Sequence, residues 1–258
     1  MCLIAFQWEP GAGLPLVVVA NRDEYYARQT APLAWWEGGR VLAGTDLEAG
    51  GTWMGVTRGG RFAALTNVRD GRRARTGPIS RGLIARRYLE GGDSAAAFLE
   101  NLRQNRSQYD PFNLLLWDGG ELLGYEGGQD RILTFPPGLH AVSNGDFDEP
   151  WPKVQALVEG LGELLEDDEA LLTRLRSSEP FDDDQLPRTG VPIAWERALS
   201  PVFVQTPTYG TRASTLLRVG REAVSMLEQR YAGRDCEGRS EFRFQIQFSP
   251  STAGNRTR

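Results

Sequence analysis

The chain begins Met1-Cys2-Leu3-Ile4-Ala5-Phe6, and residues 16–20 then read Leu-Val-Val-Val-Ala before the polar tetrad Asn21-Arg22-Asp23-Glu24. A turn rich in glycine and proline, residues 10–15, separates the two apolar runs. β-Branched apolar runs between such turn residues are typical of strands. This stretch therefore predicts a hairpin that returns the polar tetrad towards the start of the chain.

Cys2 directly follows the initiator methionine, and it is small enough for an aminopeptidase to remove Met1. The mature chain would then carry a thiol and a free α-amine on one residue, which is an N-terminal nucleophile with its own base. A thiol pKa of about 8.5 and an amine pKa of about 7.7–8.0 allow that proton transfer near neutral pH. The alternative is that Cys2 is a small hydrophobic residue at the start of a core strand.

The tetrad and two later asparagines supply the other groups that acyl transfer needs. Arg22 beside Cys2 would favour the thiolate, and Asp23 would orient the ammonium formed during attack. Asn67 and Asn144 each follow an apolar strand and so lie at strand ends, where we expect them to donate to the oxyanion. Neighbours on a strand point to opposite faces, so only one of Arg22 and Asp23 reaches Cys2 unless the chain turns at Asn21.

Composition limits the class of protein. The 258 residues, 40% hydrophobic and 24% charged, predict one domain over residues 1–250 and a disordered tail at 251–258. A net charge of −5 argues against nucleic-acid binding, and no apolar run reaches the roughly 20 residues that span a bilayer. Two cysteines without a pairing pattern favour the cytoplasm, and a single histidine, His140, excludes a polyhistidine metal site. We therefore expect a small-molecule ligand and no metal; the oligomeric state stays open.

The apolar patterns alternate between groups of strands and pairs of helices. Strands are expected at residues 2–6, 16–20, 40–43, 53–57, 62–67, 112–117, 121–125, 131–135, 139–143, 202–206, 213–219, 222–229 and 242–248. Helices are expected at residues 80–90, 94–102, from 152 onward, and 169–176. Residues around Pro32 are expected to form a loop, and residues 177–200 a long loop that covers a site. This order fits an α+β fold, a four-layer αββα sandwich of two antiparallel sheets.

Another polar cluster, residues 208–215, leads into a late strand. Arg212 within it could bind a substrate carboxylate as a bidentate fork. The alternative is a β-turn at Gly210 with an exposed arginine.

Together these residues resemble the NRDE family, also called the transport and Golgi organisation protein 2 family. The resemblance spans nearly the whole chain and rests on Met1-Cys2-Leu3-Ile4, Asn21-Arg22-Asp23-Glu24, Gly51-Thr52-Trp53-Met54-Gly55, Ala64-Leu65-Thr66-Asn67, Ser143-Asn144, Leu186-Pro187-Arg188-Thr189-Gly190-Val191 and Tyr209-Gly210-Thr211-Arg212-Ala213-Ser214-Thr215. The family looks like a branch of the N-terminal nucleophile hydrolases. More distantly, the pattern is similar to that of bile salt hydrolases and penicillin V acylases.

The resemblance implies a cysteine amidohydrolase that cleaves a small amide and requires no cofactor. Cys2 maps to the nucleophile, Arg22 and Asp23 to an arginine–aspartate pair, and Asn67 and Asn144 to the oxyanion and amine contacts. Arg212, Trp53 and Asn21 are then expected to bind substrate. The family's association with haem trafficking implies an alternative of another class, a haem carrier whose arginines meet propionates. A scaffold without catalytic activity is a third reading.

Overall fold

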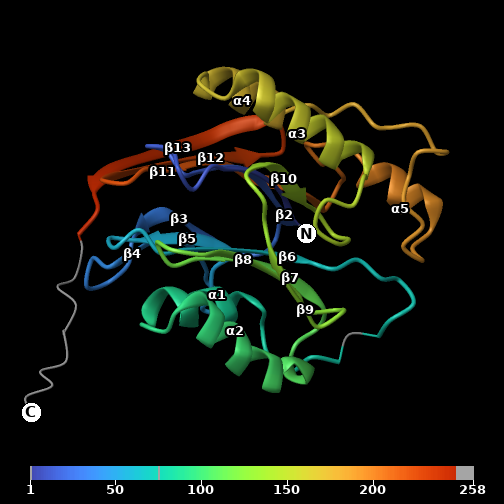
Figure 1. Ribbon diagram of the computed structural model, residues 1–258. Coiled ribbons are helices and arrows are strands. Elements are labelled where there is room, and N and C mark those ends of the chain that lie inside the picture. Colours follow the sequence, from blue (N-terminus) through green and yellow to red (C-terminus); the bar gives the residue numbers. More distant parts are fainter. Residues whose placement is uncertain (1, 75, 248–258) are drawn as a thin grey trace, which may run out of the picture.

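The computed structural model describes residues 2–74 and 76–247, so the tail expected at residues 251–258 lies outside the described residues. Figure 1 shows four layers, in which two stacked sheets lie between two pairs of helices. All strand pairs between consecutive neighbours in the described part are antiparallel. The αββα sandwich predicted from the element order is confirmed.

In the first sheet, the hairpin formed by the first strands of the chain lies between two later strands. Among the described residues the sheet has six strands in the order β10-β1-β2-β11-β12-β13. These are β1 (Cys2–Trp8), β2 (Leu16–Tyr25), β10 (Gly138–Val142), β11 (Tyr209–Val219), β12 (Ala223–Ala232) and β13 (Asp235–Gln245). The predicted hairpin is β1 and β2, and β2 continues through the whole polar tetrad.

The second sheet is a meander, so strands that are consecutive in sequence are also neighbours in space. Its seven described strands run in the order β3 to β9. They are β3 (Thr30–Trp35), β4 (Val41–Asp46), β5 (Met54–Thr57), β6 (Phe62–Asn67), β7 (Phe112–Trp117), β8 (Leu122–Glu126) and β9 (Arg131–Thr134).

Each sheet is covered on its outer face by helices. In Figure 1, α1 (Gly82–Glu90) and α2 (Ala95–Gln104) lie on the seven-stranded sheet, and α3 (Pro152–Leu164) and α4 (Asp168–Leu175) lie on the six-stranded sheet. A short 3₁₀ helix (Arg106–Gln108) follows α2, and a short helix, α5 (Ile193–Ala198), lies at one edge. In the described part no helix is both long and apolar enough to cross a membrane.

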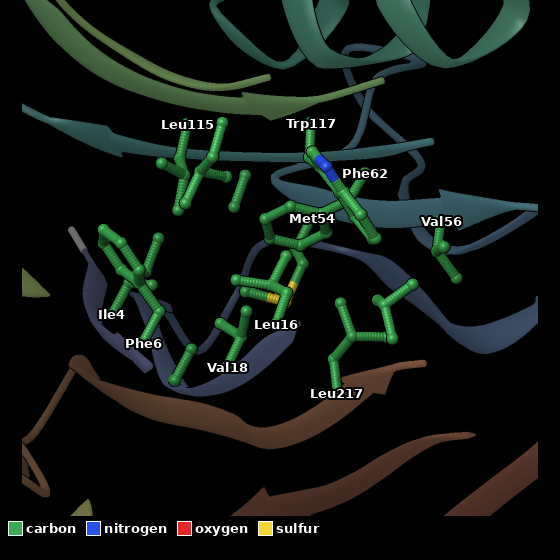
Figure 2. Packing of buried hydrophobic residues seen from close by; sticks show 14 of the residues in the cluster. Ile4, Phe6, Leu16, Val18, Met54, Val56, Phe62, Leu115, Trp117 and Leu217 are labelled. Carbon is green, nitrogen blue, oxygen red and sulfur yellow. The ribbon is translucent and has the colours of Figure 1, made fainter. Parts of the chain in front are cut away.

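The main core lies between the two sheets and is built by alternate residues of the strands. Figure 2 shows Ile4, Phe6 and Val18 facing Leu115 and other side chains of the second sheet. The intervening residues of β1 and β2 pack under α3 and α4 instead, for example Leu3 and Val19. Because strands alternate sides, every residue of this hairpin has its face fixed by the register.

Three local expectations were wrong. The loop expected around Pro32 is edge strand β3, whose register shifts between Ala31 and Ala34 in the way that admits proline in a sheet. Residues 177–200 contain α5, which is too short for a helical pattern to reveal. Residues 202–206 do not form a strand. The apolar side chains of Val202 to Val204 are buried, but their backbone groups form hydrogen bonds with Ser177 and Thr211 instead of pairing along a neighbouring strand.

Candidate active site

Cys2 and Arg22 are directly opposite each other in the β1–β2 register. Paired residues of antiparallel strands present their side chains to the same face, and Ile4 on β1 places that face between the two sheets. At this end of the sandwich the core gives way to a cavity of about 990 Å³. Its walls include the predicted residues Cys2, Arg22, Asp23, Trp53, Asn67 and Arg212. The hairpin therefore brings the polar tetrad to the thiol as the sequence predicted.

Asp23 lies on the opposite face of β2 from Arg22, as the strand alternation requires. Its carboxylate Oδ1 accepts a hydrogen bond from Thr211 Oγ1 at 2.8 Å, and its carbonyl accepts one from Tyr209 Oη at 2.9 Å. Burial raises the pKa of this carboxyl group, and the Lys153 ammonium opposes the increase most strongly. The negative charge of Asp23 raises the pKa of the Cys2 thiol, and a backbone hydrogen bond from Asp23 lowers it to a smaller extent. The aspartate therefore belongs to the site through its backbone and its charge.

The thiol of Cys2 is 6% exposed, and its burial raises its pKa to about 11. The positive charge of Arg22 acts in the opposite direction but does not overcome the burial. The Arg22 guanidinium also lies 3.7 Å from the Glu24 carboxylate, whose negative charge offsets part of the positive charge of Arg22. At neutral pH the sulfur therefore holds its proton, and the thiolate expected from Arg22 alone does not form without a proton acceptor.

The two predicted asparagines occupy different places. Asn67 ends β6 and lines the cavity. Asn144 is buried behind it, and its Nδ2 donates to the Asn67 carbonyl at 2.9 Å. The neighbouring Ser143 hydroxyl donates to the Cys2 carbonyl at 3.3 Å. Asn67 is therefore positioned to meet a ligand, whereas Asn144 positions Asn67 beside the start of the chain.

Arg212 lies in a β-bulge, where the pairing of β11 with β2 shifts between Thr211 and Ala213. A bulge re-aims the extra side chain, and Arg212 Nη1 donates to the carbonyls of Tyr25, Tyr26 and Arg28. The guanidinium thus braces the turn after β2 as well as lining the cavity. The β-turn alternative for this cluster was wrong, because Tyr209 to Val219 form one strand.

Asn21 does not line the described cavity. Its Nδ2 donates to the carbonyls of Leu175 and Val202, and its Oδ1 accepts from Ser214 at 2.6 Å. The side chain is fully buried on the helix side of β2. This placement corrects the sequence prediction that Asn21 binds substrate. Its side-chain amide instead joins β2 to the end of α4 and to the backbone at Val202.

The segment that the sequence predicted to cover a site closes one side of the cavity. Val191, Pro192, Trp195 and Leu199 all line it, so residues 186–199, called here the cap, cover the site that the loop was expected to cover. The cap is held by an ion pair of 2.8 Å between Arg69 and Glu196, both buried.

Nothing local in the sequence distinguishes Arg69 from Arg72 or Arg73, which remain exposed.

Lys153 was also missed as a site residue. It is the second residue of α3, it is 2% exposed, and its Nζ donates to the Leu199 carbonyl at 3.0 Å. Burial lowers its pKa to about 8. The one available signal was that it is the only lysine in the sequence.

The ligand types in the cavity bear on metal and haem chemistry. Among the described residues, no group of three or more His, Cys, Asp or Glu is arranged to hold a metal ion. His140 lies outside the cavity, where its ring bonds Asp148 and the Pro136 carbonyl. The described residues that line the cavity include arginines, which could pair with the propionates of haem. Among these lining residues, only Cys2 and the tyrosines could serve as an axial ligand of the haem iron.

Comparisons with solved structures identify the fold. A variant of the conjugated bile acid hydrolase from Clostridium perfringens has a TM-score of 0.51 at 9% identity, over 97% of this chain and all of that one. A second variant of the same enzyme gives 0.50 at 8% identity, over 96% and 97% of the two chains. This likeness shows that the chain has the N-terminal nucleophile hydrolase fold.

Sequence comparisons identify the family. The Bos taurus protein described as Transport and Golgi organization protein 2 homolog is 30% identical over 263 residues, which cover 91% of this chain and 95% of that protein. The Drosophila melanogaster Transport and Golgi organization protein 2 is 28% identical over 273 residues, covering 92% and 95%. A family model described as Transport and Golgi organisation 2 matches residues 1–233. The chain therefore belongs to the Transport and Golgi organisation 2 family.

Proposed function

We propose that this protein is an N-terminal-cysteine amidohydrolase that cleaves a small amide through an acyl-enzyme. The observation that carries the proposal is the β1–β2 register, which places the Cys2 thiol opposite Arg22 on the wall of a cavity. The fold is shared with a protein named as a hydrolase of conjugated bile acids, which supports the class of reaction.

In the proposed mechanism, removal of Met1 frees the α-amine of Cys2. The thiol proton passes to this amine, and the sulfur attacks the substrate carbonyl carbon. The Asn67 side chain donates to the oxygen as it gains negative charge. The ammonium then returns the proton to the leaving nitrogen, the C–N bond breaks, and a thioester remains on Cys2. The amine next takes a proton from water, whose oxygen attacks the thioester carbonyl. The C–S bond then breaks, the ammonium returns its proton to the sulfur, and the acid is released with Cys2 restored.

Two measurements test the proposal. Intact mass of protein from its native host reports whether Met1 has been removed, and retention of Met1 would leave Cys2 without its base. A panel of N-acyl amides is then incubated with the wild type, Cys2→Ala and Cys236→Ala. Cys236 is exposed and far from the tetrad in the sequence, so its variant is the matched control. We expect hydrolysis by the wild type and Cys236→Ala, and its loss in Cys2→Ala. Equal activity in all three proteins would refute the proposal.

A haem carrier is the alternative proposal, favoured by the size of the cavity and by the arginines on its walls. In this case haem titration gives a Soret band that weakens in Arg22→Met and Trp53→Ala but is unchanged in Cys2→Ser. Hydrolysis that depends on Cys2, without such a band, excludes the carrier in favour of the enzyme.

A further inference from the structure

Lys153 is the only lysine among the 29 basic residues of the chain, and it is also one of the most buried. Every other basic position is arginine, including those on the exposed surface. Arginine keeps its charge at any physiological pH, whereas a buried lysine can give up its proton. The buried position of Lys153, the one lysine of the chain, therefore points to a role for a basic group that can lose its charge.

The side chain of Lys153 enters the site from the helix layer. α3 packs over β1 and β10, and its first turn begins at Pro152. The Nζ of Lys153 donates to the carbonyl of Leu199, the cap residue that also lines the cavity. Lys153 thus lies on the helix side of the first sheet, the side to which the Asp23 side chain also points, and it contacts the cap.

The charges around Lys153 come from four separate elements. Asp23 of β2 favours its ammonium most strongly, and Cys2 of β1 and Glu196 of α5 act in the same direction. Arg69, in the segment after β6, opposes it. Reciprocally, Lys153 is the charge that most lowers the pKa of the buried Asp23 carboxyl. A carboxylate removed from water needs such a cation to remain ionised.

We propose that Lys153 is a positioning residue of this site: its ammonium keeps Asp23 ionised, so that Asp23 can hold the α-amine of Cys2 as the base for the Cys2 thiol. The inference rests on the proposed function. The proton leaves sulfur and arrives on the α-nitrogen, and Asp23 stabilises the ammonium that forms. Lys153 neither gains nor loses a proton in this step. Its burial, which lowers its pKa to about 8, sets the upper end of the pH range in which it can act.

The test follows alkylation of Cys2 by iodoacetamide across about pH 5–10, with intact mass as the readout. It uses Met1-free protein with Cys236→Ser, so that Cys2 is the only thiol. The variants are Lys153→Met, which removes the charge and keeps the stem, and Lys153→Arg, which keeps the charge. Arg243→Met, in the exposed ion pair with Glu241, is the control for loss of a cation.

We expect Lys153→Met to lower the alkylation rate about tenfold below about pH 8, where Lys153 carries its charge, and to change it by less than about threefold above about pH 9. Lys153→Arg and Arg243→Met should stay within about threefold of the parent. A purely structural role would change the rate on both sides of pH 8, whereas loss of the lysine charge acts only below about pH 8.

A second pair of proteins asks whether the effect passes through Asp23. In an Asp23→Asn background, Lys153→Met should change the rate by less than about threefold. An undiminished effect there would mean that Lys153 acts on the thiol directly, which overturns the inference. An unchanged rate below about pH 8 in Lys153→Met overturns it while leaving the enzyme proposal standing. A wild-type Cys2 that resists alkylation at every pH refutes both, and this outcome differs from the other two.

Discussion

Replacing Arg69 by methionine tests whether one buried ion pair holds the cap over the cavity. Arg69 Nη2 lies 2.8 Å from Glu196 Oε2, with 5% and 2% of the two side chains exposed. Arg69 Nε also donates to Thr189 Oγ1 at 3.2 Å, and its guanidinium lies 4.8 Å from the Trp151 ring centre. All these contacts join the segment after β6 to the cap or to the start of α3.

The magnitude follows from what remains after the change. Removal of one partner of a buried ion pair costs about 3–5 kcal/mol, because the other charge is left uncompensated. Glu196 keeps two hydrogen bonds to its Oε1, from the Thr189 backbone at 2.8 Å and hydroxyl at 2.7 Å. We therefore expect the lower end, about 3 kcal/mol. The loss should appear as opening of the cap, because the cap can leave the cavity while the two sheets stay packed.

Hydrogen exchange followed by mass spectrometry measures this opening peptide by peptide. In Arg69→Met we expect residues 186–199 to exchange about a hundredfold faster or more, while peptides from β1 and β7 change little. Adding Glu196→Leu removes the stranded carboxylate and should recover more than half of the loss. Arg243→Met breaks an exposed pair with Glu241 and should leave the cap unchanged. Cap exchange that is equal in wild type and Arg69→Met would refute the reasoning.

Two further predictions concern stability. The pKa of His140 is raised through its hydrogen bond to Asp148, although its burial acts in the opposite direction, so the stabilisation is present below about pH 6.5 and is lost as pH rises through the folded-state value. His140→Gln should therefore lower the urea midpoint at acidic pH and have little effect at alkaline pH; a constant effect would contradict this assignment. Gly71→Ala places a Cβ 2.6 Å from the backbone of Gly190, which forces the cap outward, so cap exchange should accelerate. Gly13→Ala, with nothing within 4 Å, is its control.

The sandwich could be predicted because its determinants are local. Strand alternation assigned Arg22 and Asp23 to opposite faces, and the glycine and proline residues between residues 10 and 15 defined the hairpin that pairs Cys2 with Arg22. The Pro152 start of α3 could also be read from the sequence. In each case the residues that decide the structure lie close together in the sequence.

The rest depends on residues that are distant in sequence. Nothing near Arg69 indicates that Glu196, 127 positions later, will meet it under the cap. Asn21 carries the polar character expected of a site residue, yet its bonds to Leu175 and Val202 form only when α4 and the chain after it pack on β2. Polarity predicts that a side chain needs partners. It does not say whether those partners are a substrate or the protein's own backbone.

The burial of Cys2 determines which mechanism is open to this protein. A thiol pKa of about 11 means that about one molecule in ten thousand holds the thiolate at neutral pH, which corresponds to a cost of about 5 kcal/mol. Arg22 is already opposite the sulfur and does not remove this cost, so a further cation alone is not the missing component. A base on the same residue avoids it, because the proton moves within Cys2 and the two charges form together. In the proposed mechanism Asp23 stabilises that ammonium and Lys153 keeps Asp23 ionised, so loss of either should slow attack.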